Sequence, residues 1–149
     1  MRALSFIFCL FLGSAGIAQD MDLKSLKLAL AQRAVVIAEN GPSVEYELDG
    51  IQIYLIADES ANRMRLISGI TEESKVKAED LKKMMEANFD RALDAKYALS
   101  NGFLWSVYAH PLKELEKEQL IDALYQVKNL VNNYGTTYNS TDFIFGVDN

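Results

Sequence analysis

Residues 88–112 decide the fold, and they read NFDRALDAKYALSNGFLWSVYAHPL. The stretch contains the end of an amphipathic helix and then two short apolar runs that meet at Asn101-Gly102. Asn-Gly between such runs indicates a β-hairpin with a two-residue turn, because a type I′ turn needs a positive φ at both central residues. His110-Pro111 ends the second run, since proline cannot donate to a strand ladder. The stretch therefore predicts a helix followed by a hairpin.

An earlier hairpin turns at Asp49-Gly50. Apolar residues alternate with two glutamates over residues 44–48, and the alternation continues over residues 51–57 after the turn. A third strand follows at residues 63–68, beyond a short polar segment. Three successive strands with short turns indicate an antiparallel meander.

Apolar residues that recur every three or four positions predict three helices, at residues 22–39, 78–94 and 116–134. Together with the strands, these helices give the order α-β-β-β-α-β-β-α. Helices packed on an antiparallel sheet of about five strands bury these apolar stripes most simply. The predicted fold class is therefore α+β.

Residues 1–18 have the pattern of a secretory signal peptide, with Arg2 ahead of a short apolar run and small residues before a cut between Ala18 and Gln19. The run is too short to span a bilayer, which takes about 20 apolar residues. A helix buried in the domain is the alternative interpretation.

We expect cleavage at that point to leave residues 19–149 as a single domain, either periplasmic or secreted. Cys9 is the single cysteine and lies inside the apolar run, so we expect neither lipidation nor a stable membrane anchor. Cleavage would also remove the one thiol that could serve a disulfide, a metal or a nucleophile.

The formal net charge of −6 argues against nucleic acid as a partner, because binding to phosphates depends on Lys and Arg. The sequence holds one histidine, His110, whereas a zinc site needs three or four nitrogen or sulfur ligands. Acidic pairs such as Glu72-Glu73 fall in predicted loops, where solvated charge is the simpler interpretation. We therefore predict no enzyme activity, no catalytic residues, no metal site and no cofactor.

Four short motifs carry a resemblance to a known family: residues 62–67 (NRMRLI), 87–89 (ANF), 96–99 (KYAL) and 102–105 (GFLW). With them, roughly residues 23–134 resemble the type III secretion chaperone-like family, which includes the Tir-chaperone and YbjN groups. The resemblance implies a scaffold for protein contact, commonly a homodimer, that holds extended protein segments on apolar patches. It implies no catalytic residues.

Both faces of the second hairpin are apolar. Phe103, Trp105 and Val107 share one face because successive strand residues point to opposite sides. We interpret that set as core and the opposite face as exposed in the monomer and covered in a homodimer. The candidate protein-interaction surface is Tyr54, Ile67, Leu104 and Tyr108.

A small-ligand binding or sensory module is the alternative function. Its cleft would lie between the sheet and the second or third helix, with Arg63 or Arg65 holding an acidic ligand. The simpler role for these arginines is to pair with Glu45 and Glu47 across strands.

Overall fold

The computed structural model describes residues 20–146, so the predicted signal peptide lies outside the described residues. Six strands form one antiparallel sheet in the order β1-β2-β3-β4-β6-β5. The strands are β1 (Val35–Asn40), β2 (Ser43–Leu48), β3 (Ile51–Asp58), β4 (Arg63–Glu72), β5 (Lys96–Ser100) and β6 (Phe103–His110). The helices are α1 (Leu23–Ala31), α2 (Ala78–Asp90) and α3 (Lys117–Asn132), with a 3-10 turn η1 (Glu73–Lys75). The predicted α+β class is confirmed, with one strand more than the sequence indicated.

The extra strand is β1, which the sequence analysis placed in the first helix. That helix ends at Ala31, and the prediction that it runs to residue 39 was wrong. Val35, Val36 and Ile37 are β-branched and fit a pleated strand better than a helix. Beyond Asn40 the chain turns and returns as β2, whose backbone gives this segment a strand partner.

The two hairpin turns predicted from the sequence have the expected geometry. The φ angles are 53° at Asp49 and 80° at Gly50, and 51° at Asn101 and 75° at Gly102. Positive φ at both central positions matches the right-handed twist of the flanking strands. The turns set the pairing of β2 with β3 and of β5 with β6.

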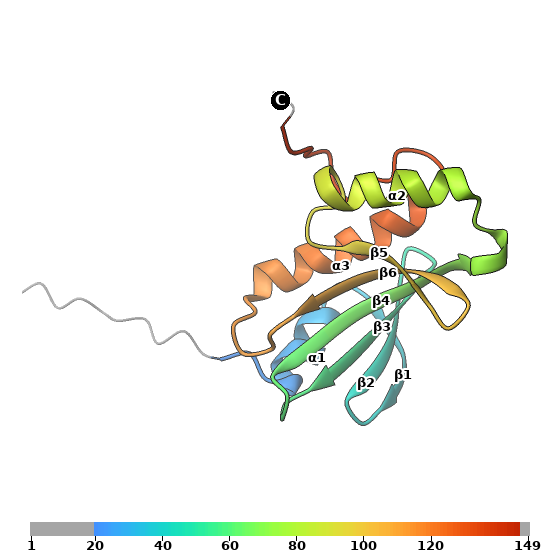
Figure 1. Cartoon of the computed structure of the whole chain (residues 1–149). Helices are drawn as coiled ribbons and strands as arrows, with labels where there is room; N and C mark the ends of the chain where they lie inside the picture. The colour runs from blue at the N-terminus through green and yellow to red at the C-terminus, as the bar shows by residue number, and fades with distance from the viewer. Residues whose placement is uncertain (1–19, 147–149) are drawn as a thin grey trace, which may run out of the picture.

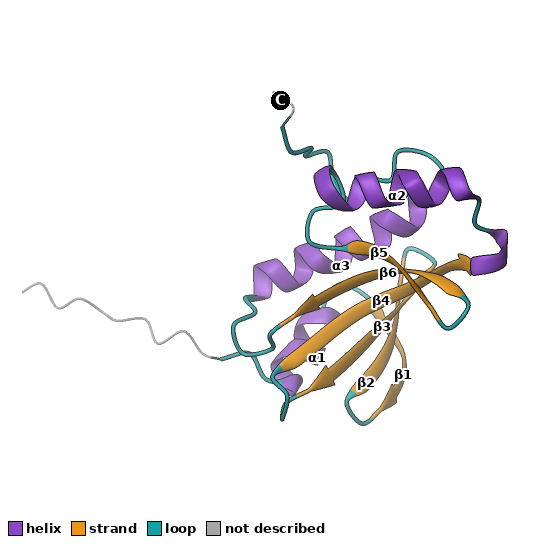
Figure 2. Ribbon diagram, in the orientation of Figure 1, coloured by secondary structure: helices purple, strands orange, loops and turns teal. Residues whose placement is uncertain are grey.

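The helices cover one face of the sheet. In Figure 1, α1 and α3 lie behind the strands, and α2 lies beyond β5 at the top. The secondary-structure colouring in Figure 2 shows that the strands make one layer and α1 and α3 the other. The core fills the space between these two layers. Its largest buried side chains include Leu26, Leu30, Tyr46, Ile53, Leu55, Leu66, Leu104, Tyr108 and Leu120. We call the opposite side of the sheet the open face.

The two edges of the sheet differ. At the β5 edge, the side-chain amide of Asn88 on α2 bonds to the backbone of Tyr97 as a neighbouring strand would. Its Nδ2 donates to the Tyr97 carbonyl at 3.0 Å, and its Oδ1 accepts from the Tyr97 N–H at 2.8 Å. The Lys96 ammonium donates to the carbonyls of Asn88 and Leu93, which fixes the same edge to α2. The chain therefore occupies the outward backbone groups of Tyr97 on the β5 edge with its own residues, and we call this edge covered.

The β1 edge has no such cover. All six residues of β1 are exposed, and in residues 20–146 no further strand pairs with its outer side. Helix α1 contacts the end of β1 and the turn after it, where the Lys27 ammonium bonds to the Glu39 carboxylate and to the Gly41 carbonyl, each at 2.6 Å. The sheet thus has one covered edge and one bare edge.

Replacing Asn88 with alanine tests the cover on β5. Tyr97 would lose partners for its N–H and C=O in a partly buried place, which costs about 1–3 kcal/mol of unfolding free energy. Urea denaturation followed by circular dichroism measures this loss. The matched control is Asn132→Ala, an exposed position at the end of α3, with an expected change within about 0.5 kcal/mol. Equal effects of the two variants would contradict the proposed cover.

Candidate protein-interaction surfaces

The open face is organised by the strand register. One row of paired residues crosses five strands in the direction of the interstrand hydrogen bonds. The row is Glu45, Tyr54, Ile67, Val107 and Lys96. Its centre is apolar and half-buried, and its two ends carry opposite charges. A contiguous apolar strip of this kind on a one-sided sheet is a candidate contact surface.

Two aromatic side chains extend the apolar strip along β6. The ring centroids of Phe103 and Trp105 are 6.1 Å apart, with 53° between the ring planes. The indole N–H of Trp105 donates to the Ser100 carbonyl at 3.0 Å, which holds the ring in place. Both rings therefore lie on the open face, and the prediction that Phe103 and Trp105 are core was wrong.

Of the four residues predicted to form the interaction surface, the structure places Tyr54 and Ile67 on the open face and the other two in the core. Leu104 is 1% exposed and Tyr108 is 2% exposed, beneath the helices. The pairing of β6 with β4 sets this arrangement, because Tyr108 is opposite the buried Leu66. The prediction that Leu104 and Tyr108 belong to an exposed surface was therefore wrong.

The sequence contains a signal that identifies the inward face. Across a two-residue turn, Lys96 and Ser100 fall on the same face as Phe103 and Val107. A lysine and a serine favour solvent, so this face is the better candidate for the outside.

The predicted arginine-based ligand cleft does not form. Arg63 and Arg65 are exposed and alternate with the buried Met64, so they lie on the open face rather than between the sheet and a helix. Among the described residues neither arginine makes an ion pair, and the expected pairing with glutamates of β2 is absent there. Glu45 instead accepts from the Gln52 amide at 3.1 Å.

His110 serves a structural contact. Its ring stacks on the Tyr108 ring with centroids 6.0 Å apart and 2° between the planes. Its Nδ1 donates to the Pro111 carbonyl at 2.7 Å. Within residues 20–146, no group of three or more His, Cys, Asp or Glu is placed to hold a metal ion. Over the same residues, none of the helices combines the length and the hydropathy that crossing a membrane requires.

The bare edge is a second candidate surface, and sequence reasoning missed it. Val35 is 64% exposed and Ile37 is 51% exposed, so β1 presents branched apolar side chains to solvent together with its unpaired backbone. Leu28 on the neighbouring helix α1 is also exposed. A cavity of about 490 Å³ lies beside β1 and is lined by Lys27, Leu28 and Glu39 among others.

Comparison with known proteins bears on the fold. The sequence matches no family model and no curated protein. Among solved structures, a chain of the HopA1–SchA chaperone–effector complex superposes with a TM-score of 0.57 at 12% sequence identity, over 75% of this chain and 88% of that chain. A chain of the ExsC–ExsE complex superposes with a TM-score of 0.52 at 10% identity, over 71% of this chain and 84% of that chain.

The chain shares the fold of these two solved chains, one of which comes from a chaperone–effector complex. This confirms the fold that the sequence motifs implied. At these identities the likeness concerns the fold alone, and membership of the YbjN group stays a prediction.

The assignment of the two faces predicts losses of stability of different size at two aromatic residues of β6, Tyr108 and Trp105. Burial, with smaller contributions from Asp94 and Asp122, raises the pKa of Tyr108 to about 12, and its hydroxyl has no hydrogen-bond partner among the described residues. Tyr108→Phe should therefore retain or slightly raise stability, since an unsatisfied buried hydroxyl costs about 1–3 kcal/mol. Tyr108→Ala should cost about 3–5 kcal/mol through the cavity that it leaves.

Trp105→Ala, on the open face, should cost about 1 kcal/mol. Urea denaturation followed by circular dichroism compares the three variants. A larger loss for Trp105→Ala than for Tyr108→Ala would reverse the assignment of faces.

Proposed function

We propose that this protein is an exported, non-enzymatic, chaperone-like domain that binds an extended segment of a partner polypeptide as an added strand at β1. The observation that carries the proposal is the difference between the two edges. Asn88 occupies the hydrogen-bonding groups of Tyr97 on β5, while β1 is exposed along its whole length. An edge with free N–H and C=O groups is the site at which strand addition occurs.

The side chains around β1 suit an apolar segment. Strand addition takes affinity from the main chain and specificity from places that receive alternate side chains. An added strand would lie about 4.8 Å from β1. On the helix side it would meet Val36 and the cavity lined by Leu28, and on the open side it would meet Val35.

The apolar first part of β1 supports a binding role. Natural proteins commonly guard an exposed edge with lysine, proline, a bulge or an inward charge. β1 has a register shift between Val36 and Ala38 and a charge at Glu39, which Lys27 of α1 pairs. Val35, Val36 and Ile37 nevertheless leave an exposed apolar backbone edge, which favours pairing with another chain.

The fold also supports a role in binding another polypeptide. The solved chains with this fold come from a chaperone–effector complex and from the ExsC–ExsE complex. We therefore propose a chaperone-like role and, from the four sequence motifs, kinship with the YbjN group.

Secretion chaperones of the resembling family work in the cytoplasm, whereas residues 1–18 indicate export. We therefore propose that this protein meets its partner in the periplasm or outside the cell. The N-terminal residue of the exported protein tests this, and Gln19 is the residue expected.

Self-association is the second part of the proposal. Tyr54, Ile67 and Val107 form an apolar strip on the open face that a second copy would cover most simply. Light scattering on residues 19–149 should give a dimer, and Ile67→Glu should give folded monomers because it places charge in the strip. The control Leu28→Glu, exposed on α1, should leave the dimer intact. A monomeric parent protein would overturn this part.

Strand addition is tested by cross-linking followed by binding. A photo-cross-linking residue in place of Val35 should capture a polypeptide. The same residue in place of Leu99, which is exposed on β5 beside the occupied Tyr97, should not. A synthetic peptide of the captured segment should bind the parent protein and bind Ile37→Lys about tenfold or more weakly, since lysine guards an edge.

The matched control is Leu99→Lys, which places the same charge on β5 beside the occupied Tyr97 and should bind as the parent does. Equal weakening by both variants, or equal capture at positions 35 and 99, would contradict strand addition at β1.

A further inference from the structure

The sheet divides at its centre, where β3 and β4 separate. Their ladder pairs Asp58 with Arg63 and ends at Tyr54 with Ile67. Beyond that pair, β3 continues with β2 and β4 continues with β6. The Ser68 hydroxyl donates to the Gln52 carbonyl at 2.6 Å, so a side chain bridges the first position at which the ladder is lost.

A cleft of about 420 Å³ opens at this division. Three aromatic residues from two strands contribute to its wall: Tyr54 of β3, and Phe103 and Trp105 of β6. Val131 of α3 also lines it, so the cleft extends from the open face into the helix layer. The cleft is therefore deeper than a shallow patch on a flat sheet.

Gly69 makes room beside the indole ring. A Cβ placed at Gly69 would lie 3.6 Å from the Trp105 ring, at ordinary contact distance. Gly69 and Trp105 both line the cleft, so the absence of a side chain at Gly69 leaves space next to the indole ring. Gly69 does not have a positive φ that would forbid alanine, so a small substitution is available that fills this space.

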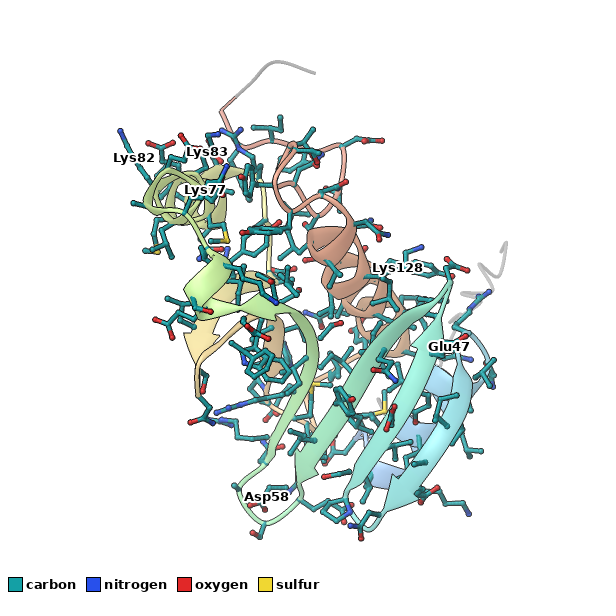
Figure 3. All side chains as sticks on the ribbon, turned by 90° about the vertical axis from the view of Figure 1, so that its right-hand side faces the viewer. Glu47, Asp58, Lys77, Lys82, Lys83 and Lys128 are labelled. Carbon is teal, nitrogen blue, oxygen red and sulfur yellow. The ribbon has the colours of Figure 1, made fainter. Side chains whose placement is uncertain are left out.

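The one charged residue that lines the cleft is Glu47. Within residues 20–146 it makes no ion pair and its side chain makes no hydrogen bond. The cations near this end of the sheet are engaged elsewhere: Lys128 bonds to Asp49 at 2.7 Å, and Lys75 to Glu72 at 3.3 Å. Figure 3 shows Glu47 and Lys128 at the same end of the sheet, with Asp58 at the other.

We propose that this cleft, which we call the aromatic cleft, binds the guanidinium group of an arginine side chain of the partner polypeptide. The source of the arginine rests on the proposed function. A planar guanidinium stacks on aromatic faces and bonds to a carboxylate through two N–H groups, whereas an ammonium is a strongly hydrated point charge. Aromatic rings together with a free carboxylate therefore select arginine among the natural side chains.

The cleft is close to the bare edge. Glu47 is paired directly with Val35 of β1 in the strand register, so one row connects the edge with the rim of the cleft. A segment bound at β1 would lie two strand spacings, about 10 Å, from the strand that carries Glu47. A long side chain from a segment that turns onto the open face would cross this distance.

The protein carries its own probe of the aromatic cleft, because Trp105 is the single tryptophan. Titration of residues 19–149 with N-acetyl-arginine amide should shift the one indole N–H signal in an NMR spectrum and change the tryptophan emission, both saturating with the same dissociation constant. The neutral isostere N-acetyl-citrulline amide should bind about tenfold more weakly or not at all.

Two variants should weaken arginine-amide binding while the protein stays folded. Glu47→Gln removes the carboxylate and should cost about tenfold, and Gly69→Ala fills the space beside the indole. Glu118→Gln, an exposed position at the start of α3, removes the same charge outside the cleft and should bind as the parent does. Thermal unfolding confirms that each variant is folded.

An equal response to the arginine and citrulline probes, or an unchanged constant in Glu47→Gln, would overturn the proposal. If the indole signal instead depends on protein concentration and Arg65→Gln abolishes that dependence, the guanidinium comes from a second copy, which overturns the assignment to a partner. If the protein binds the peptide at β1 but not the arginine amide, only the inference about the aromatic cleft is contradicted. If it binds the arginine amide but not the peptide, strand addition at β1 is contradicted and the inference about the cleft is kept.

Discussion

An antiparallel sheet ends in two rows of backbone N–H and C=O groups, and this chain supplies a partner for one row. Asn88 of α2 bonds to both backbone groups of Tyr97, and the Lys96 ammonium bonds to carbonyls around it. That arrangement fixes α2 against β5 and closes one side of the domain. The other side ends in β1, with its backbone edge and its valines in solvent. The difference between the two edges therefore depends on one side-chain amide, that of Asn88 near the end of α2.

The helices add a second asymmetry. α1 and α3 bury the inner face, where Tyr46, Leu66 and Leu104 are almost inaccessible. The open face keeps Tyr54, Ile67 and Trp105 without a helix over them. The chaperone-like binding that we propose needs apolar surface that stays exposed while the domain stays folded. A one-sided sheet meets both requirements because its core does not depend on the open face. The division between β3 and β4 then gives that face a cleft.

The sequence predicted the local structure where one residue type forces one geometry. The turns at Asp49-Gly50 and Asn101-Gly102 were predicted because few other residues accept a positive φ. Helices α2 and α3 were predicted because their apolar pattern continues over several helical turns. The first helix was extended too far, because a short apolar run such as Val35–Val36–Ile37 fits both the helix period and the strand period. What makes it a strand is its pairing with β2, a tertiary contact that the local sequence pattern does not show.

The exposed side of the sheet could be predicted only in part. Tyr54 and Ile67 lie next to strands whose charged residues show the outward face, and they were placed correctly on the open face. Leu104 and Tyr108 were placed wrongly because both sides of the hairpin are apolar, so its pattern alone does not show which side faces the core. The pairing of β6 with β4 decides this. The aromatic cleft was beyond prediction, because it depends on where the β3–β4 ladder ends.

The central claim is that β1 is a bare edge while β5 is a covered one, and amide hydrogen exchange tests it most directly. On residues 19–149 alone, the Tyr97 amide should exchange slowly because Asn88 accepts its hydrogen bond. The amides of β1 that point away from β2 should exchange near the rate of an unstructured chain. Slow exchange of those β1 amides in the free protein would show that the edge is already occupied and would contradict the account.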